Sequence, residues 1–275
     1  MTRRLGKIEL AVSSRRLIGA VFDLCYPRGC ADCGGEMAAA LPVSGALVTD
    51  QLAPAVCRDC RASYLASIGG EAATGTFCQR CGSFAQQVDV PGIEGCRRCA
   101  NWKRSGVAGV VPLGPYEGRL REAVLRMKLP TGDGLARALA DVLWQTRGEW
   151  IRRIEVDAVV PVPMHRWRRL TRGISSAERI AARLGKNWGV EMGRRVLVRR
   201  RNTLPQGGLT AEGRRRNVRG ALAVTAGYDL RGLRIALVDD VMTTGATVNE
   251  AARVLRRAGA ASVHALVIAR TDHPA

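Results

Sequence analysis

The sequence lacks long hydrophobic runs and is poor in aromatic and acidic residues. No stretch of eighteen consecutive apolar residues occurs, and a membrane-spanning helix needs about that length, so we expect no membrane span. Aromatic residues make up only 4% of the chain, which leaves Trp167 and Trp188 as the main candidates for stacking on nucleic-acid bases. Basic residues outnumber acidic ones by 43 to 24, giving a formal charge of +19. Such an excess favours polyanionic partners through long-range attraction and counterion release.

The positive charge leaves two interpretations open. It indicates either a contact with single-stranded DNA, or an arginine-rich composition combined with a pyrophosphate-binding pocket. The N-terminal segment 1–24 is basic, but Arg15 and Arg16 interrupt its apolar residues and no small-residue cleavage site follows. We therefore expect no signal peptide and a cytoplasmic location. At 275 residues, the chain is long enough for one α/β domain and a smaller appendage.

Eight of the nine cysteines form four C-x-x-C pairs. The pairs are Cys30/Cys33, Cys57/Cys60, Cys78/Cys81 and Cys96/Cys99. Four thiolates satisfy the tetrahedral preference of Zn²⁺, so the pattern predicts two structural zinc sites in a double zinc-ribbon domain over residues 25–100. The glycines after Cys33 and Cys81 are typical of zinc knuckles, where the turn needs a residue without a Cβ.

The pairing of these cysteines is open at the level of sequence. Sequential pairing is the simplest, while interleaved pairing and disulfides are the alternatives. Cys25 is either a buried thiol or an alternative ligand for Cys30. The apolar residues between Cys25 and Cys99 are too scattered to predict a core, so metal binding would have to stabilise this segment.

Downstream of residue 106 the chain alternates between strand and helix patterns, which predicts an α/β domain with a parallel sheet over residues 107–275. We expect strands at 107–113, 156–160, 234–238 and 262–269, and helices at 119–129, 135–147, 175–188 and 248–258. Trp144 is expected in the core. Residues 194–220 are the least regular and are rich in arginine, which is typical of a mobile lid beside a pocket.

Two adjacent carboxylates, Asp239 and Asp240, end an apolar run and precede a loop of small and hydroxyl residues at 243–247. Backbone N–H groups at the start of the next helix, with threonine hydroxyls beside them, can hold a phosphate dianion. Gly245 lets the backbone come close to such a ligand. Because the carboxylates would repel the phosphate, we expect them to hold vicinal sugar hydroxyls or to face a positive charge developing on a sugar carbon.

A second anion site is predicted where strand 156–160 runs into a proline-stiffened, arginine-dense loop, since open α/β sheets bind ligands at their carboxyl edge. The candidate residues are Pro163, Met164, His165, Arg168 and Arg172. Lys128 follows an apolar helix face and can reach the same anion. A solvated basic face, and a solvated lysine, are the plain alternatives.

Residues 238–247 resemble the phosphoribosyl-pyrophosphate (PRPP) loop of type I phosphoribosyltransferases. The order of motifs along the chain resembles the ComF family, which includes competence protein ComF and the GntX type and joins a zinc ribbon to a phosphoribosyltransferase-like domain. These motifs are the four C-x-x-C pairs, Met127-Lys128-Leu129, Pro161 to His165, Arg172-Gly173, Thr203, Gln206, Leu209, Arg216-Asn217-Val218 and the Asp239-Asp240 loop. The chain departs from the family at Ile174-Ser175-Ser176, where Phe-Asn-Gln is usual, so amides that could read a base are missing.

The resemblance implies an enzyme that transfers a phosphoribosyl group from PRPP, with Mg²⁺, to an unidentified acceptor. Asp239 and Asp240 would be catalytic, and Lys128, Pro163, Met164, His165, Arg168 and Arg172 would face pyrophosphate. The implied PRPP loop comprises Val238, Val241, Met242, Thr243, Thr244, Gly245, Ala246 and Thr247. The alternative is a non-catalytic factor of DNA uptake that handles single-stranded DNA and meets a protein partner of the competence machinery.

Overall fold

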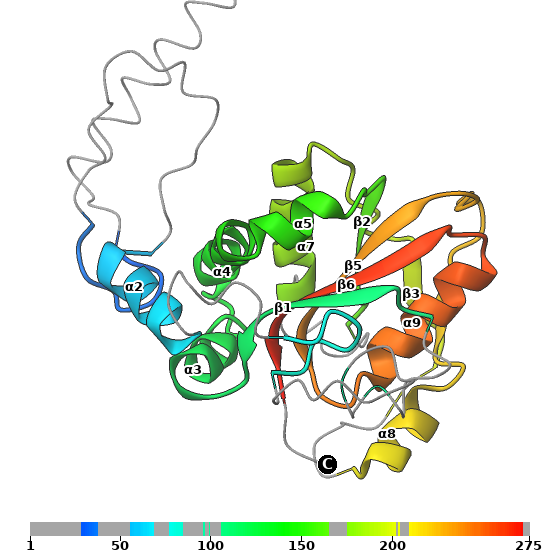
Figure 1. The fold of residues 1–275 in the computed structure, drawn as a ribbon, viewed down its shortest axis with the longest axis horizontal. Helices are drawn as coiled ribbons and strands as arrows, with labels where there is room; N and C mark the ends of the chain where they lie inside the picture. Colours follow the sequence, from blue (N-terminus) through cyan, green and yellow to red (C-terminus); the bar gives the residue numbers. More distant parts are fainter. Residues whose placement is uncertain are drawn as a thin grey trace, which may run out of the picture.

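The computed structural model describes residues 29–37, 56–68, 77–84, 96, 99, 106–164, 175–201, 203 and 209–271. A four-stranded sheet in the order β1–β6–β5–β2 lies at its centre (Figure 1). Its strands are β1 (Gly109–Pro115), β2 (Ala158–Pro161), β5 (Arg234–Met242) and β6 (Ser262–Arg270). All three strand pairings are parallel, so the predicted parallel α/β sheet is confirmed.

Helices cover both faces of this sheet. On one face, α3 (Gly118–Arg126), α4 (Asp133–Thr146), the short α5 (Gly148–Arg153) and α7 (Ser176–Trp188) share a hydrophobic cluster with Ala236 and Val238 of β5. On the other face, α9 (Ala246–Arg257) clusters with Ile235 and Leu237. Successive side chains of a strand point to opposite faces, and burial on both sides explains why β5 and β6 read as continuous apolar runs.

Local signals set the ends of the helices. The Ser175 hydroxyl accepts the Glu178 N–H at 3.1 Å, which caps the start of α7, and the helix ends at Gly189 with φ +70°. The predicted helix 119–129 ends earlier, at Arg126, and Met127 to Leu129 form a turn. Lys128 therefore lies on the turn that follows α3.

Residues 194–220 are more regular than expected. They contain β3 (Leu197–Arg199) and α8 (Ala211–Val218), and β3 pairs antiparallel with β4 (Leu222–Val224). The sequence carries no clear pattern for these elements. Each strand is only three residues long, and α8 has three arginines and an asparagine where a core-facing helix has apolar residues. The expectation of an irregular stretch is wrong for these residues.

The cysteine-rich segment also contains a helix, α2 (Arg58–Ser67), which lies against α3 (Figure 1). Tyr64, Ile68 and Phe77 are buried in the same hydrophobic cluster as the sheet. A Cβ at Gly114 of β1 would come within 2.4 Å of the Ile68 side chain, so the contact is close. The expectation that this segment lacks a core is thus wrong, because its apolar residues pack on the sheet.

Two tryptophans pack together between α4 and α7. Trp144 and Trp188 meet edge to face with their ring centroids 5.1 Å apart, and both lie against the hydrophobic cluster. Trp144, which was expected in the core, is partly buried and packs against the edge of this cluster. Trp188 is half-buried in the same pair and serves packing, so the structure does not support its selection as a base-stacking platform. No helix among the described residues combines the length and apolarity needed to cross a membrane.

Candidate functional site

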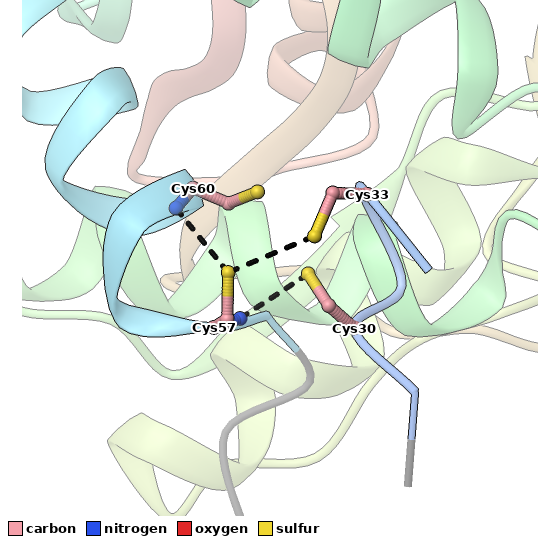
Figure 2. A group of neighbouring side chains, drawn as sticks. All are labelled: Cys30, Cys33, Cys57 and Cys60. Atoms are coloured by element: carbon pink, nitrogen blue, oxygen red, sulfur yellow. Dashed lines mark hydrogen bonds between the residues drawn. The ribbon is translucent and has the colours of Figure 1, made fainter. Parts of the chain in front are cut away.

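The first cysteine group lies at the start of α2 and consists of Cys30, Cys33, Cys57 and Cys60 (Figure 2). The four sulfur atoms lie within 4.8 Å of one another, and those of Cys33 and Cys57 are 3.8 Å apart. Tetrahedral Zn²⁺ with bonds of about 2.3 Å to sulfur places its ligands about 3.8 Å apart. The Cys57 N–H also donates to the Cys30 sulfur at 3.2 Å. This geometry could hold a zinc ion.

The second group consists of Cys78, Cys81, Cys96 and Cys99, all of them buried. The Cys78 and Cys99 sulfurs lie 3.5 Å apart, as do those of Cys81 and Cys96. Hydrogen bonding from the Cys81 thiol lowers the pKa of Cys78 to about 4, while the same contact and burial raise the pKa of Cys81. Only a cation lets all four neighbouring thiols ionise together, so this group also fits zinc.

The two groups follow the sequential pairing and not the interleaved one, and none of the eight described cysteines forms a disulfide. The two knuckle turns are alike. The N–H of Gly34 donates to Cys30 O at 2.9 Å and the N–H of Gly82 donates to Cys78 O at 2.6 Å. Both glycines have φ above +70°, as expected for a turn that excludes a Cβ.

The two cysteine groups belong to different hydrophobic clusters. Cys30 and Cys60 belong to the hydrophobic cluster of α3, α4 and α7, whereas all four cysteines of the second group belong to the cluster of α9. Asp32, inside the first knuckle, is buried and forms ion pairs with Arg119 and Arg126 of α3. The second knuckle is close enough to β1 that a Cβ at Gly82 would lie 2.7 Å from Val110.

Strand β5 carries Asp239 and Asp240 to the carboxyl edge of the sheet, and continues to Met242 because Val241 and Met242 pair with β6. Asp240 points toward the face of α3 and α7. There it forms an ion pair with Lys128, with Nζ 3.3 Å from a carboxylate oxygen, and accepts the Ser176 hydroxyl at 2.9 Å. The structure thus brings Lys128 to the paired carboxylates.

Burial, together with the negative charge of Asp240, raises the pKa of Asp239 to about 8. The cations Lys128 and Arg199 act in the opposite direction, as does the Asp240 N–H, which donates to the Asp239 carboxylate at 2.9 Å. Asp239 is only partly exposed. The two carboxylates therefore repel each other when both are charged, and a cation or a ligand with hydroxyl donors would stabilise the charged pair.

The loop after β5 runs from Thr243 to Gly245, and α9 starts at Ala246. Gly245 has φ +74°, a left-handed conformation in which a side chain would be strained. The Thr244 hydroxyl accepts the Ala246 N–H at 3.4 Å. The start of α9 and its N–H groups lie at the same edge of the sheet as the carboxylates, which is the arrangement of an anion site beside an acidic pair.

Two further residues at this edge were missed by the sequence analysis. Arg199, at the end of β3, donates to Pro163 O at 3.1 Å and to the Thr203 hydroxyl at 2.6 Å. Ser176 holds Asp240, as described above. The available signals were the run of three arginines at 199–201 and the change from the family pattern at Ser176, but neither indicates a contact by itself.

The structure places part of the predicted second anion site. The Val162 N–H donates to Val238 O at 2.8 Å, so Pro163 and Met164 follow directly beside the end of β5. His165, Arg168 and Arg172 lie outside the described residues, as do Trp167, Cys25 and the segment 1–24.

Comparison with known proteins agrees with this geometry. A model of the phosphoribosyl transferase domain matches residues 131–275. Competence protein F of Haemophilus influenzae is 28% identical over 70% of this chain and 84% of its own length. DNA utilization protein YhgH of Salmonella typhimurium is 30% identical over 71% of this chain and 85% of its own length. Adenine phosphoribosyltransferase of Mycobacterium avium is 55% identical over 42 residues.

The parallel sheet, the acidic end of β5 and the threonine-glycine loop before α9 define a phosphoribosyltransferase-type α/β domain. Strand β1 precedes the matched region but pairs with β6 inside the same sheet. The chain belongs to the ComF family.

Proposed function

We propose that this chain binds PRPP with Mg²⁺ at the carboxyl edge of β5 and transfers its phosphoribosyl group to an acceptor. The observation that carries the proposal is the paired carboxylate of Asp239 and Asp240 beside the threonine-glycine loop, with Lys128 3.3 Å from Asp240. An acidic pair and an anion-binding loop at one edge match the two ends of a ribose 5-phosphate.

Each group has a definite task in this proposal. The Thr243 to Thr247 amides and hydroxyls hold the 5′-phosphate, and the two aspartates hold the 2′- and 3′-hydroxyls. Val238, Val241 and Met242 form the end of strand β5 that leads into this loop. The segment Pro163 to His165, with Arg168 and Arg172, faces pyrophosphate. Lys128, which pairs with Asp240, can move from that carboxylate toward the leaving group.

The transition state of this transfer resembles an oxocarbenium ion, so negative charge near the ribose and positive charge near pyrophosphate both lower the barrier. Asp239 and Asp240 supply the first, and the arginines and Lys128 supply the second. Carboxylate and phosphate oxygens are the ligands that Mg²⁺ prefers, and the ion would neutralise charge on the leaving group.

Calorimetry with PRPP and Mg²⁺ tests the proposal. We expect Asp240→Asn to weaken PRPP binding at least about tenfold, because hydrogen bonds to a charged group contribute roughly 1.5–3 kcal/mol each, while the zinc content is unchanged. Asp157→Asn is the matched control, since Asp157 pairs with Arg234 at the opposite end of β2 and β5. Equal affinities in the parent and Asp240→Asn would contradict the assignment.

A second candidate function is the binding of single-stranded DNA, in keeping with the names of the competence and DNA-utilization relatives. The observation that favours it is a row of exposed arginines on and after α8, Arg215, Arg216 and Arg219. Arginines on one short element can contact successive phosphates. The two functions use different residues and are compatible, since these arginines follow β3 and the acidic pair belongs to β5.

Fluorescence anisotropy with a labelled single strand, measured over a range of salt concentrations, tests this candidate. Replacing Arg215, Arg216 and Arg219 by glutamine should weaken binding and reduce the salt slope by about 0.7 for each phosphate that is no longer neutralised. Replacing the exposed Arg121, Arg152 and Arg153 by glutamine removes the same charge elsewhere. Equal losses of affinity in the two triple variants would show a general charge effect and would count against a site on α8.

A further inference from the structure

Arg270, the last residue of β6, is buried beneath the loop that follows β5, with 3% of its surface exposed. Its guanidinium donates to Met242 O at 3.1 Å and also to the carbonyl of Thr243. On its other side, Nε donates to Cys81 O at 3.2 Å. One side chain therefore joins the backbone of the phosphate loop to the backbone of the second cysteine group.

These bonds have a consequence for the orientation of the loop. In a planar trans peptide, the C=O and N–H point in opposite directions. Because Arg270 holds the Thr243 carbonyl toward the interior, the N–H of Thr244 is turned the other way, toward the side where a phosphate would bind. The buried cation behind the loop also favours an anion in front of it.

The contact to Cys81 makes this orientation depend on the cysteine group. The Cys81 carbonyl belongs to the knuckle turn 78–83, which is closed by hydrogen bonds from Gly82 N to Cys78 O and from Cys78 N to Ser83 O. A metal ion on Cys78, Cys81, Cys96 and Cys99 would fix this turn. A change in the conformation of this turn would move the Arg270 guanidinium, and with it the Thr243 carbonyl to which the guanidinium donates.

We propose that Arg270 is a positioning residue that couples metal occupancy of the second cysteine group to the ligand affinity of the phosphate loop. The regulatory part rests on the proposed PRPP binding, whereas the mechanical link stands on the hydrogen bonds alone. Coupling is reciprocal, so a ligand on the loop stabilises the knuckle by the same free energy by which the knuckle favours the ligand.

The experiment compares the zinc-loaded full chain with its Arg270→Lys variant. Lysine keeps the charge but carries its donors on one nitrogen, so it cannot place donors at both positions, Nε and Nη1, from which Arg270 reaches the Cys81 and Thr243 carbonyls. Without ligand, we expect faster hydrogen exchange in the variant at residues 78–84 and 242–247 together. The Kd for PRPP–Mg²⁺ should rise about fivefold or more, with zinc content unchanged. PRPP should slow exchange at 78–84 in the parent but not in the variant.

Arg183→Lys is the control, because the Arg183 side chain is only 15% exposed and donates to Asp141 between α7 and α4, away from both the loop and the second cysteine group. It should lower the melting temperature and leave the PRPP affinity unchanged. If both variants lose stability alike and bind PRPP like the parent, Arg270 is only structural and the proposal is wrong. If the parent does not bind PRPP, the proposed function is wrong. Independently of that result, unchanged hydrogen exchange at residues 78–84 in the ligand-free Arg270→Lys variant would overturn the coupling.

Discussion

At the scale of single residues, Asp239 has the property with the clearest physical consequence. Its pKa is raised from an ordinary value of 3.8 to about 8 by burial and by the charge of Asp240. Between these two values the folded protein retains a proton that the unfolded chain has released. The free energy of unfolding therefore falls as the pH rises from about 4 to 8, by up to about 1.4 kcal/mol per pH unit.

Urea unfolding of the ligand-free protein at pH 5.5 and pH 8.5 tests this assignment. We expect the parent protein to lose stability toward pH 8.5, and the isosteric Asp239→Asn variant to lose less, because the amide has no proton to release. The difference between the two proteins isolates this carboxyl from other titrating groups. A pH dependence identical in both proteins would show that Asp239 titrates in its ordinary range.

The residues of the site differ in how well the sequence predicts them. Asp239, Asp240 and Thr243 to Thr247 form one contiguous motif, so local spacing was sufficient. Ser176 lies 64 positions from the Asp240 that it contacts, and Arg270 lies 189 positions from Cys81. Neither separation leaves a local pattern, and only the folded sheet brings these residues to one edge.

At the scale of elements, α3 connects the first cysteine group to the candidate site. Its arginines Arg119 and Arg126 bind the buried Asp32 in the knuckle, and the turn that follows the helix presents Lys128 to Asp240. The helix is amphipathic and packs Leu120, Ala123 and Val124 on the sheet. The position of α3 therefore depends on the knuckle on one side and the sheet on the other.

Replacing Asp32 by asparagine tests this connection. The change keeps the shape but removes the charge that both arginines bind, and we expect it to lower the free energy of unfolding by about 1.5–3 kcal/mol, since the arginines can still reach water. Glu122→Gln is the control, because Glu122 is an exposed partner of the same Arg119 at 3.3 Å. That variant should change stability by less than about 1 kcal/mol. Similar losses in the two urea titrations would contradict a special role for Asp32.

The sequence predicted long elements better than short ones. The strands and helices of the sheet domain carry sustained apolar runs or helical periodicity, and all of them are present in the structure, with ends shifted by a few residues. Elements without such a signal were missed. Helix α2 lies among cysteines and polar residues, and β3, α8 and β4 lie among arginines, so no apolar pattern marks these elements.

At the scale of the whole molecule, the two cysteine groups contact the sheet domain at different places, the first at α3 and the second at the edge strand β1. The sequence predicted both groups and left their pairing open, and it did not predict that they share hydrophobic clusters with β1 and β5. Tyr64 and Phe77, from the cysteine-rich segment, both belong to the cluster of α3, α4 and α7. The division into a separate cysteine-rich domain at 25–100 and a sheet domain at 107–275 stays a prediction.

The order of the strands also bears on how the chain is assembled during synthesis. Strand β6 lies between β1 and β5, so β1 gains its neighbour only after β5 and α9 have left the ribosome. Until then β1 and α3, which contact the knuckles, have emerged without the rest of the sheet. Pairing between such distant segments is slow, and metal captured early by the cysteines would protect the nascent front half during this delay.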